Sequence, residues 1–308
     1  MRALHRSAFG IFAAVIALFA SLAAYVARST SVMMTAEAER TVKSVVRETT
    51  TRIDRLLRTV EAVTGNYAWI VGEHLGDPDY MYRITRELVG NNECIVGSAI
   101  AFEPDFYKGK GRLFAPYSCA DTNGQVRSLT LPYEYPDQEW YRVARESAKA
   151  HWCEPYLDEG GGGIMMCTFS VPLTNEAGRV YAVLTADISL DRMTEQISTI
   201  CPYPQSYAVM TSCAGKYLVM PPQGRTFERD EETITIRDRT DNGWVVAIVC
   251  PVEKILSGAR RLVSYVVAFA VLGLLILIPV SCVHMSRLQR EFVVREWAAN
   301  NLETATED

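Results

Sequence analysis

Two stretches decide the organisation of this chain: AFGIFAAVIALFASLAAYVA, residues 8–27, and LVSYVVAFAVLGLLILIPVSCV, residues 262–283. Neither stretch contains a charged side chain. A helix needs about 20 apolar residues to cross the hydrocarbon core of a bilayer, so each stretch is long enough to do so. The sequence therefore predicts two membrane helices, with a folded domain between them and a short tail, residues 284–308, after the second.

The first apolar stretch has two interpretations, because Arg2, His5 and Arg6 precede it as the basic leader of a secretory signal would. It is either a cleaved signal or a retained membrane anchor. The stretch is longer than the roughly 7 to 15 apolar residues of a typical signal, and Tyr25-Val26-Ala27 offers no clean cleavage site between small residues. These features favour an anchor over residues 8–27, behind a leader of residues 1–7.

Basic residues flank both apolar stretches on both sides, so charge alone does not orient the chain. A long polar domain crosses a membrane largely regardless of its charge, and an anchor with so short a leader usually keeps that leader inside. We therefore expect a two-pass protein of the bacterial inner (cytoplasmic) membrane. Both termini would be cytoplasmic and the intervening domain extracytoplasmic.

The composition is that of a folded acidic domain, with 49% hydrophobic residues, 22% charged residues and a net charge of −5. Such a chain lacks the basic character of a nucleic-acid-binding protein. Of its eight cysteines, Cys282 lies in the second apolar stretch, and the others lie where an oxidising compartment favours disulfides. Cys201 with Cys213 is the pair we favour. The cysteine and histidine spacing predicts no metal site, and we expect no cofactor.

Residues 28–76 are predicted to form a long stalk helix. Its apolar side chains alternate four and three residues apart, as in a heptad pattern. These positions are Val42, Val46, Thr49, Ile53, Leu56, Val60, Val63, Tyr67 and Ile70. Two interpretations stay open: the helix packs on its own domain, or it pairs with a second copy in a homodimer.

Short strands joined by turns, with a few helices, predict an α+β domain. Pro78 opens a short helix that ends near Gly90, and residues 138–148 and 190–200 are predicted to form two more. Strands are predicted at residues 94–102, 112–119, 126–131, 163–172 and 179–188, then in a smaller set at 207–212, 216–220, 233–237 and 243–250. This grouping predicts a membrane-distal module, residues 77–189, and a membrane-proximal module, residues 190–256.

Four motifs, in this order, resemble the double Cache domain, a PAS-like extracytoplasmic sensor of bacterial receptors. They are YEYPDQEWY from Tyr133, WxEPYxDEGGGG from Trp152, TxSxP from Thr168 and LTADISL from Leu184. The resemblance covers residues 30–260 and is closest to the sensors of RsbU-type serine phosphatases, with related domains on histidine kinases and chemoreceptors. It implies two stacked modules on the long helix, of which the distal one captures a small molecule and the proximal one relays the change to the membrane.

The resemblance also implies which residues hold the ligand. The predicted site comprises the matching aromatic and acidic positions and Thr168 of the third motif: Tyr133, Trp140, Tyr141, Tyr156, Asp158, Thr168 and Asp187. Gln138 stands where amino-acid-binding relatives have an arginine that binds the ligand carboxylate. Because an amide makes weaker, neutral hydrogen bonds than a guanidinium, we expect a small polar or cationic ligand instead of an α-amino acid.

Several of these residues also suit purely structural roles. Trp140 and Tyr141 would serve as core aromatics that anchor a helix to the sheet, and Asp187 would cap the helix near Leu190. Tyr156 and Asp158, two residues apart, are expected on one face of a strand. The glycines at 160–163 predict a loop between adjacent strands, since no Lys-Ser or Lys-Thr follows them as in a phosphate-binding loop.

We predict no enzymatic activity, because the sequence has no GxSxG, HExxH or Walker motif and its four histidines are dispersed. The leading function is a ligand sensor that signals through the second membrane helix to a cytoplasmic output protein or domain. Two alternatives stay open: a truncated phosphatase or histidine kinase receptor, and a membrane-anchored scaffold that binds no ligand. The tail keeps the four-three spacing of an output helix at Leu288, Phe292, Arg295, Ala299 and Leu302.

Overall fold

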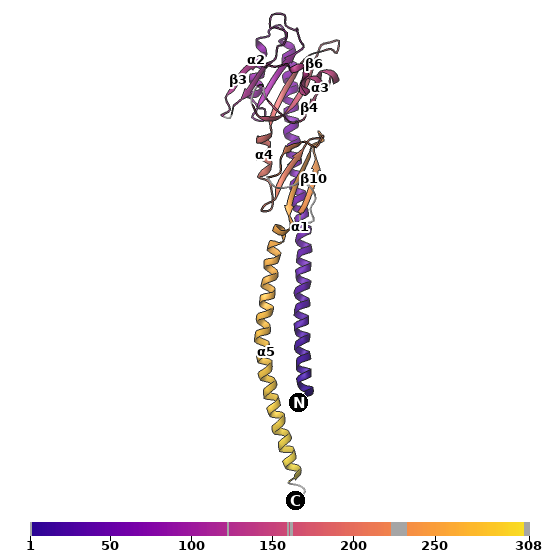
Figure 1. The fold of residues 1–308 in the computed structure, drawn as a ribbon, viewed down its shortest axis with the longest axis vertical. Helices are drawn as coiled ribbons and strands as arrows, with labels where there is room; N and C mark the ends of the chain where they lie inside the picture. Colours follow the sequence, from indigo (N-terminus) through magenta and orange to yellow (C-terminus); the bar gives the residue numbers. More distant parts are fainter. Residues whose placement is uncertain (1, 122, 159, 161–162, 223–232, 305–308) are drawn as a thin grey trace. The chain divides into compact units, whose positions relative to one another are not determined.

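The computed structural model describes residues 2–121, 123–158, 160, 163–222 and 233–304. The chain divides into two compact units, of which one is Glu39–Pro251 and the other combines the terminal segments Met1–Ala38 and Val252–Asp308. Within its described residues, the unit Glu39–Pro251 contains two antiparallel sheets and several helices (Figure 1). The α+β class predicted from the sequence is confirmed.

The terminal unit holds the two predicted membrane helices. They belong to α1 (Arg2–Glu73) and α5 (Val252–Thr304), and Pro279 lies inside α5 without ending it. The candidate spans are Ala14–Glu73 and Arg260–His284, and their most apolar windows are 0% buried. Both helices are therefore long and apolar enough to cross a membrane. The side chains of residues 8–13, and those of the five tail positions with four-three spacing, lie outside the described residues.

The larger sheet has seven strands, with β3-β2-β1-β7-β6-β4 in that order and β5 paired to β6. Its strands are β1 (Gly97–Phe102), β2 (Pro116–Ala120), β3 (Val126–Thr130), β4 (His151–Trp152), β5 (Tyr156–Leu157), β6 (Met165–Thr174) and β7 (Val180–Ser189). β4 and β5 are not among the strands predicted from the sequence, because a two-residue strand is too short to show alternation.

Two helices contact different strands of the larger sheet. α2 (Tyr80–Gly90) contacts β1, β2 and β3, whereas η1 (Tyr135–Asp137) leads into α3 (Glu139–Ser147), which contacts β6 and β7. The register pairs Asp187 with Gly97 on one side and with Thr168 on the other, so these three residues share one face. The aromatic core under α3 lies on that same face, because it includes Ala101 and its register partner Val183.

The smaller sheet has the strand order β10-β11-β8-β9. Its strands are β8 (Tyr207–Thr211), β9 (Tyr217–Val219), β10 (Thr233–Arg239) and β11 (Val245–Pro251). Between the sheets, α4 (Leu190–Ser198) contacts β6 and β7 of the larger sheet and β8 and β9 of the smaller one. Ser189 caps α4 by accepting a hydrogen bond from the backbone N–H of Arg192. The alternative that Asp187 caps this helix is therefore wrong.

The part of α1 that belongs to the unit Glu39–Pro251 packs on that unit. Besides Thr50, the side chains that it buries are Val42, Val46, Thr49, Ile53, Leu57, Val60, Thr64 and Val71. They recur about every 3.6 residues, the period of a straight helix, whereas a heptad repeats every 3.5. The predicted seam therefore holds as far as Ile53 and again at Val60, but Leu57 is buried in place of Leu56, and Thr64 in place of Val63. Of the two interpretations, the burial favours packing on the helix's own domain.

Adjacent leucines on α1 test this helical period. Leu57 is 2% exposed, so Leu57→Ala should lower the free energy of unfolding by about 2–5 kcal/mol, the usual cost of emptying a core position. Leu56 is only half-buried, and Leu56→Ala should cost less than half as much. Urea unfolding measures the free energy of unfolding of the two variants. A larger loss in Leu56→Ala than in Leu57→Ala would contradict the 3.6-residue period and support the predicted heptad seam.

All eight cysteines are free thiols in the structure. Cys213, in the turn between β8 and β9, donates a hydrogen bond from Sγ to the carbonyl oxygen of Asn242 at 3.2 Å. The expected pairing of Cys201 with Cys213 is therefore wrong, because the Cys213 thiol is directed to the turn before β11.

Candidate functional site

The candidate site is a cluster of carboxyl and hydroxyl groups buried on the α3 face of the larger sheet. Asp187 on β7 is 2% exposed, and Asp158, which follows β5, is 3% exposed. Thr168 on β6 donates a hydrogen bond from Oγ1 to Asp187 Oδ1 at 2.7 Å. With that proton committed, Thr168 Oγ1 accepts from the hydroxyl of Tyr156, 2.8 Å away. The structure thus brings Tyr156, Asp158, Thr168 and Asp187 together.

Asp158 reaches this cluster from a turn. β5 ends at Leu157, so Asp158 lies one residue beyond the strand on which it was expected to share a face with Tyr156. The backbone N–H of Asp158 donates to Ile164 O at 3.0 Å, and Asp158 O accepts from Gly163 at 2.9 Å, which closes the turn between β5 and β6. The Asp158 carboxylate accepts from the Gly160 N–H at 3.2 Å and from the Tyr117 hydroxyl at 3.1 Å.

Burial dominates the electrostatics of Asp187. Burial raises the pKa of this carboxyl, hydrogen bonds from Thr168 and Tyr117 lower it, and the nearby Asp158 raises it, so that the net change is a rise from 3.8 to about 7. Among the described residues, the groups that shift the pKa of Asp187 are thus the hydroxyls of Thr168 and Tyr117 and the carboxyl of Asp158. None of these groups is a cation. Such a site gains the most from a ligand that supplies a positive charge.

The two carboxyls and Tyr117 converge over Gly97. A Cβ atom at Gly97 would lie 2.5 Å from Asp187 Oδ2 and 2.5 Å from the Tyr117 hydroxyl oxygen, far inside van der Waals contact. Gly97 is therefore the floor of the site, and only a residue without a side chain leaves room for both polar groups.

Two further predicted residues border the cluster. Burial raises the pKa of the Tyr133 phenol, and Asp158 and Asp187 add to the rise, which places this hydroxyl near both carboxyls. The Tyr133 ring lies against Gly160, where a Cβ atom would overlap it. Trp140 is 2% exposed, and its indole N–H is buried without a hydrogen-bond partner of normal geometry, although it lowers the pKa of Tyr133 and so lies near that hydroxyl. A buried, unpaired donor at the edge of the cluster suits a ligand acceptor.

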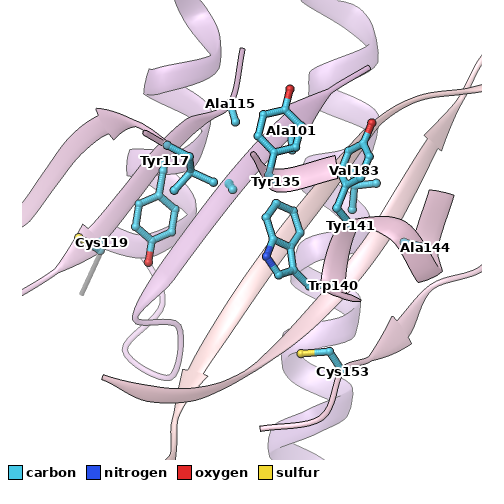
Figure 2. Packing of buried hydrophobic residues seen from close by; sticks show 12 residues of the cluster. Ala101, Ala115, Tyr117, Cys119, Tyr135, Trp140, Tyr141, Ala144, Cys153 and Val183 are labelled. Carbon is cyan, nitrogen blue, oxygen red and sulfur yellow. The ribbon is translucent and has the colours of Figure 1, made fainter. Parts of the chain in front are cut away.

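Tyr141 and Gln138 do not join the cluster. The Tyr141 hydroxyl donates to Glu103 Oε1 at 2.7 Å, and Arg145 donates to the same carboxylate, which anchors α3 to the end of β1. Figure 2 shows the Tyr141 hydroxyl directed away from the side on which the Tyr117 hydroxyl and the Trp140 indole nitrogen lie. Gln138 is exposed at the N-terminus of α3. For Tyr141 the geometry favours the core role.

Two residues of the site, Tyr117 and Gly97, are not among those predicted from the sequence. Tyr117 is 3% exposed, and burial and the two carboxyls all raise its pKa, so it remains a neutral donor. A signal for both was present in the sequence. Gly97 is an isolated glycine inside a predicted strand, which marks a close approach of other groups, and Tyr117 is a polar aromatic in the neighbouring strand. Only the register, which pairs Gly97 with Cys119 and with Asp187, connects them.

Tyr117→Phe tests the hydroxyl of Tyr117. Its loss removes an interaction that lowers the Asp187 pKa, so this pKa should rise above about 7, and Asp158 loses the hydroxyl that donates to it at 3.1 Å, at a cost of about 1–3 kcal/mol. Unfolding free energies measured as a function of pH should show the Asp187 transition displaced to higher pH. Tyr181→Phe is the matched control, because Tyr181 lies on β7 away from the cluster, and it should leave the transition in place.

Comparison with known proteins identifies the type of domain. Residues 81–195 match the model of the family "Methyl-accepting chemotaxis protein-like, first PDC sensor domain". This segment runs from α2 into α4 and includes every residue of the cluster. No curated protein sequence matches the chain.

Solved structures of sensor domains share the fold over most of the described unit. The extracellular domain of soHK1S-Z6, described as a histidine kinase, matches with a TM-score of 0.61 and 20% identity, over 74% of this chain and 98% of that one. The periplasmic sensory domain of the Campylobacter jejuni chemoreceptor Tlp1 matches with a TM-score of 0.61 and 11% identity, over 72% and 98%. The ligand-binding domain of the Pseudomonas fluorescens chemoreceptor CtaA, in complex with L-isoleucine, matches with a TM-score of 0.53 and 15% identity, over 73% and 97%. The fold is therefore that of extracytoplasmic PDC, or Cache-like, sensor domains.

Proposed function

We propose that this protein is a membrane-anchored extracytoplasmic sensor that binds a small ligand carrying a cationic amine. The observation that carries the proposal is the buried carboxyl Asp187, whose pKa is raised to about 7 by burial beside a second buried carboxyl, Asp158. An ammonium group placed between these carboxyls would favour the ionised form of Asp187 and form charge-assisted hydrogen bonds. The aromatic rings of Trp140, Tyr133 and Tyr156 supply faces that attract a cation.

The structure constrains the amine of the ligand more than it constrains the rest of the molecule, such as a carboxylate. Gln138 is exposed and offers no guanidinium, but Arg127 on β3 lies at the edge of the cluster, where its Nε donates to Cys119 Sγ at 3.3 Å. Tyr117 is among the groups that raise the pKa of Arg127, which places this guanidinium near the site. An amine without a carboxylate should bind to an Arg127→Gln variant as well as it binds to the wild-type protein. An α-amino acid whose carboxylate is held by Arg127 should bind to that variant more weakly. We propose the amine without a carboxylate, in line with the glutamine at position 138.

A thermal-unfolding screen of the purified full chain tests the proposal. Primary amines, α-amino acids, carboxylic acids and nucleobases are compared by intrinsic tryptophan fluorescence. A ligand at about 100 times its dissociation constant adds roughly 2.7 kcal/mol to the free energy of unfolding, which gives a clear upward shift in Tm. We expect amines to give this shift. Stabilisation by acids or nucleobases alone would overturn the assignment of the ligand class, and a folded protein that responds to no compound would favour the scaffold alternative.

We also propose that residues 152–154 couple the site to the membrane-proximal module. Cys153 is held to Thr168 by two bonds, one from its N–H to Thr168 O at 2.9 Å and one from the Thr168 N–H to its Sγ at 3.2 Å. Its neighbours contact the smaller sheet: the Trp152 ring centroid lies 5.5 Å from that of Trp244, and Glu154 accepts a hydrogen bond from Ser212. A displacement of Thr168 on ligand binding would therefore be transmitted through residues 152–154 to β8 and β11.

Hydrogen exchange tests this coupling with an amine that stabilises the protein in the screen. Binding should slow exchange at the backbone amides of β8 and β11 in the wild-type protein. Trp152→Leu removes the contact with Trp244 and should abolish that response while binding persists. Trp69→Leu is the matched control, because Trp69 is 70% exposed on α1. An undiminished response in Trp152→Leu would contradict the role of residues 152–154.

The remaining assignments follow from this function. We assign residues 77–189 to a membrane-distal module, residues 190–256 to a membrane-proximal module, and residues 284–308 to a cytoplasmic tail that contacts an output protein or domain, with both termini cytoplasmic. Pro251 ends β11 and Val252 begins α5, so the last strand of the sensor continues directly into the helix that we propose to carry the signal. A homodimer, and a kinship closest to the sensors of RsbU-type phosphatases, stay predictions. We propose no catalytic activity.

A further inference from the structure

A hollow lies on the face of the larger sheet opposite the carboxyl cluster. Its volume is about 600 Å³, within the range of small-molecule sites, and its lining includes the end of α2, the start of β3, the end of β7 and part of α4. α2 covers this face, because Ser118, the neighbour of Tyr117 on β2, hydrogen-bonds Thr85 of α2 at 2.8 Å. Asp187 and Ile188 are consecutive on β7, so their side chains point to opposite faces of the sheet. Ile188 lines the hollow, so the hollow and the cluster lie back to back across β7.

The floor of the hollow is apolar. Four buried hydrophobic side chains form it, from α2, the segment before β1, β7 and α4: Val89, Ile95, Ile188 and Met193. Leu56 of α1 borders the hollow too and is only half-buried. A narrow extension of about 20 Å³ shares Leu56 and Met193 with the hollow and continues between α1 and α4, towards Ile53 and Ile197. A ligand that lies on this floor therefore needs an apolar body.

The polar group best placed to orient such a ligand is the guanidinium of Arg192, at the rim of the hollow. Arg192 Nη1 donates to Glu93 O at 2.8 Å, which holds this exposed side chain in place. The ion pairs among the described residues do not include Arg192. Arg192 lies in the first turn of α4, behind the Ser189 cap, where the helix dipole adds positive potential. A carboxylate can accept two charge-assisted hydrogen bonds from one edge of a guanidinium.

We infer that this hollow binds a small monocarboxylate with an apolar body, at a site separate from that of the amine. The carboxylate would pair with Arg192, and the apolar body would cover Ile188 and Met193 on the floor. The other charged residues that line the hollow, among those that the structure describes, are Glu93 and Glu195. A second negative charge on the ligand would meet these two carboxylates without a cation to pair with, so the hollow should reject dicarboxylates. The inference goes beyond the proposed function and does not depend on it.

The same lining argues against a cationic ligand in the hollow. Glu93 and Glu195 are both exposed, and attraction between exposed charges is weak in water. A cation would also lie beside the guanidinium of Arg192 and the N-terminus of α4, which both repel it. A carboxylate instead meets a planar guanidinium that its hydrogen bond to Glu93 O already orients.

Titration calorimetry on the purified full chain, in a non-ionic detergent, tests the inference with hexanoate as the probe. Acetate, which has no apolar body, and hexanedioate, which carries a second charge, should both bind at least about tenfold more weakly than hexanoate. Arg192→Gln should weaken hexanoate binding at least about tenfold, and Arg192→Lys, which keeps the charge and loses the bidentate geometry, should bind with intermediate affinity. Arg142→Gln is the matched control. Arg142 is an exposed arginine on α3, on the other face of the sheet, and this variant should bind hexanoate as the wild-type protein does.

Failure of the wild-type protein to bind hexanoate, or binding that Arg192→Gln leaves unchanged, overturns the inference. Equal affinity for hexanoate and hexanedioate overturns the restriction to monocarboxylates. Asp187→Asn separates the two sites, because it should retain hexanoate binding, and a loss there would place the acid in the carboxyl cluster instead. A chain that binds hexanoate through Arg192 but binds no amine would leave this inference standing and overturn the proposed function. Amine binding without hexanoate binding would do the reverse.

Discussion

Asp187→Asn is expected to abolish amine binding and, at the same time, to make the unliganded protein more stable at neutral pH. The asparagine oxygen can still accept from Thr168, but it carries no charge to pair with an ammonium group. Loss of one partner of a buried charge pair usually costs 3–5 kcal/mol, so affinity should fall at least about 100-fold. The thermal screen measures both effects, as the loss of the ligand-induced shift and as a higher Tm without ligand.

The gain in stability follows from the direction of the Asp187 pKa shift. In the folded protein the pKa is raised from 3.8 to about 7, so the folded state holds this proton more tightly than the unfolded state does. Stability is therefore unimpaired below pH 3.8, falls as pH rises towards 7, and stays reduced above that, by roughly 4 kcal/mol in total. Asp187→Asn should remove this slope. Asp191→Asn, an exposed control in the first turn of α4, should keep it, and a slope that survives in Asp187→Asn would contradict the assignment.

Gly97→Ala is the second variant with a large expected effect. The new methyl group would lie 2.5 Å from both Asp187 Oδ2 and the Tyr117 hydroxyl, so one or both must move. Overpacking of this kind costs about 1–3 kcal/mol of stability, and displacement of the two polar groups should also weaken amine binding by an order of magnitude or more. Urea unfolding and the thermal screen measure the two losses.

Gly65→Ala is the matched control for Gly97→Ala. A Cβ atom at Gly65 meets no other atom within 4 Å, and the residue lies inside α1, where alanine is the better helix former. This variant should gain roughly 0.5–1 kcal/mol and bind the amine normally. Equal behaviour of the two variants would show that Gly97 is not the floor of the site.

The sequence predicts the elements of this fold well and their junctions less well. Except for β4 and β5, the strands of both sheets fall close to their predicted ranges, as do the helices α2, α3 and α4, because each has a clear period or a clear turn at its ends. β4 and β5 carry no such signal. The buried stripe of α1 departs from the predicted seam by one residue at Leu57 and Thr64, although the two agree as far as Ile53 and again at Val60, since a heptad and a straight helix differ by only about 0.1 residue per turn.

The acidic part of the site was predictable from motifs, whereas its donors were not. Asp158, Thr168 and Asp187 belong to quoted motifs, and the structure brings them together. Tyr117 and Gly97 lie outside those motifs, and only the strand register brings them to Asp187. Tyr141 belongs to a motif but is used to anchor α3, because the residue after Trp140 on a helix faces another direction. The motifs therefore identified the segments that contribute to the candidate site. The direction of each side chain decides whether it belongs to the cluster or packs in the core.

Proton release on binding tests the central claim most directly. An amine identified in the screen is titrated into the full chain by calorimetry, just below pH 7, in buffers that differ in their enthalpy of ionisation. Because Asp187 is more than half protonated there and must ionise to pair with an ammonium group, binding should release a substantial fraction of one proton. The release should decrease steadily as pH rises above 7, and Asp187→Asn should neither bind nor release. Tight amine binding with no proton release at any pH, or binding retained by Asp187→Asn, would show that the ligand does not pair with Asp187.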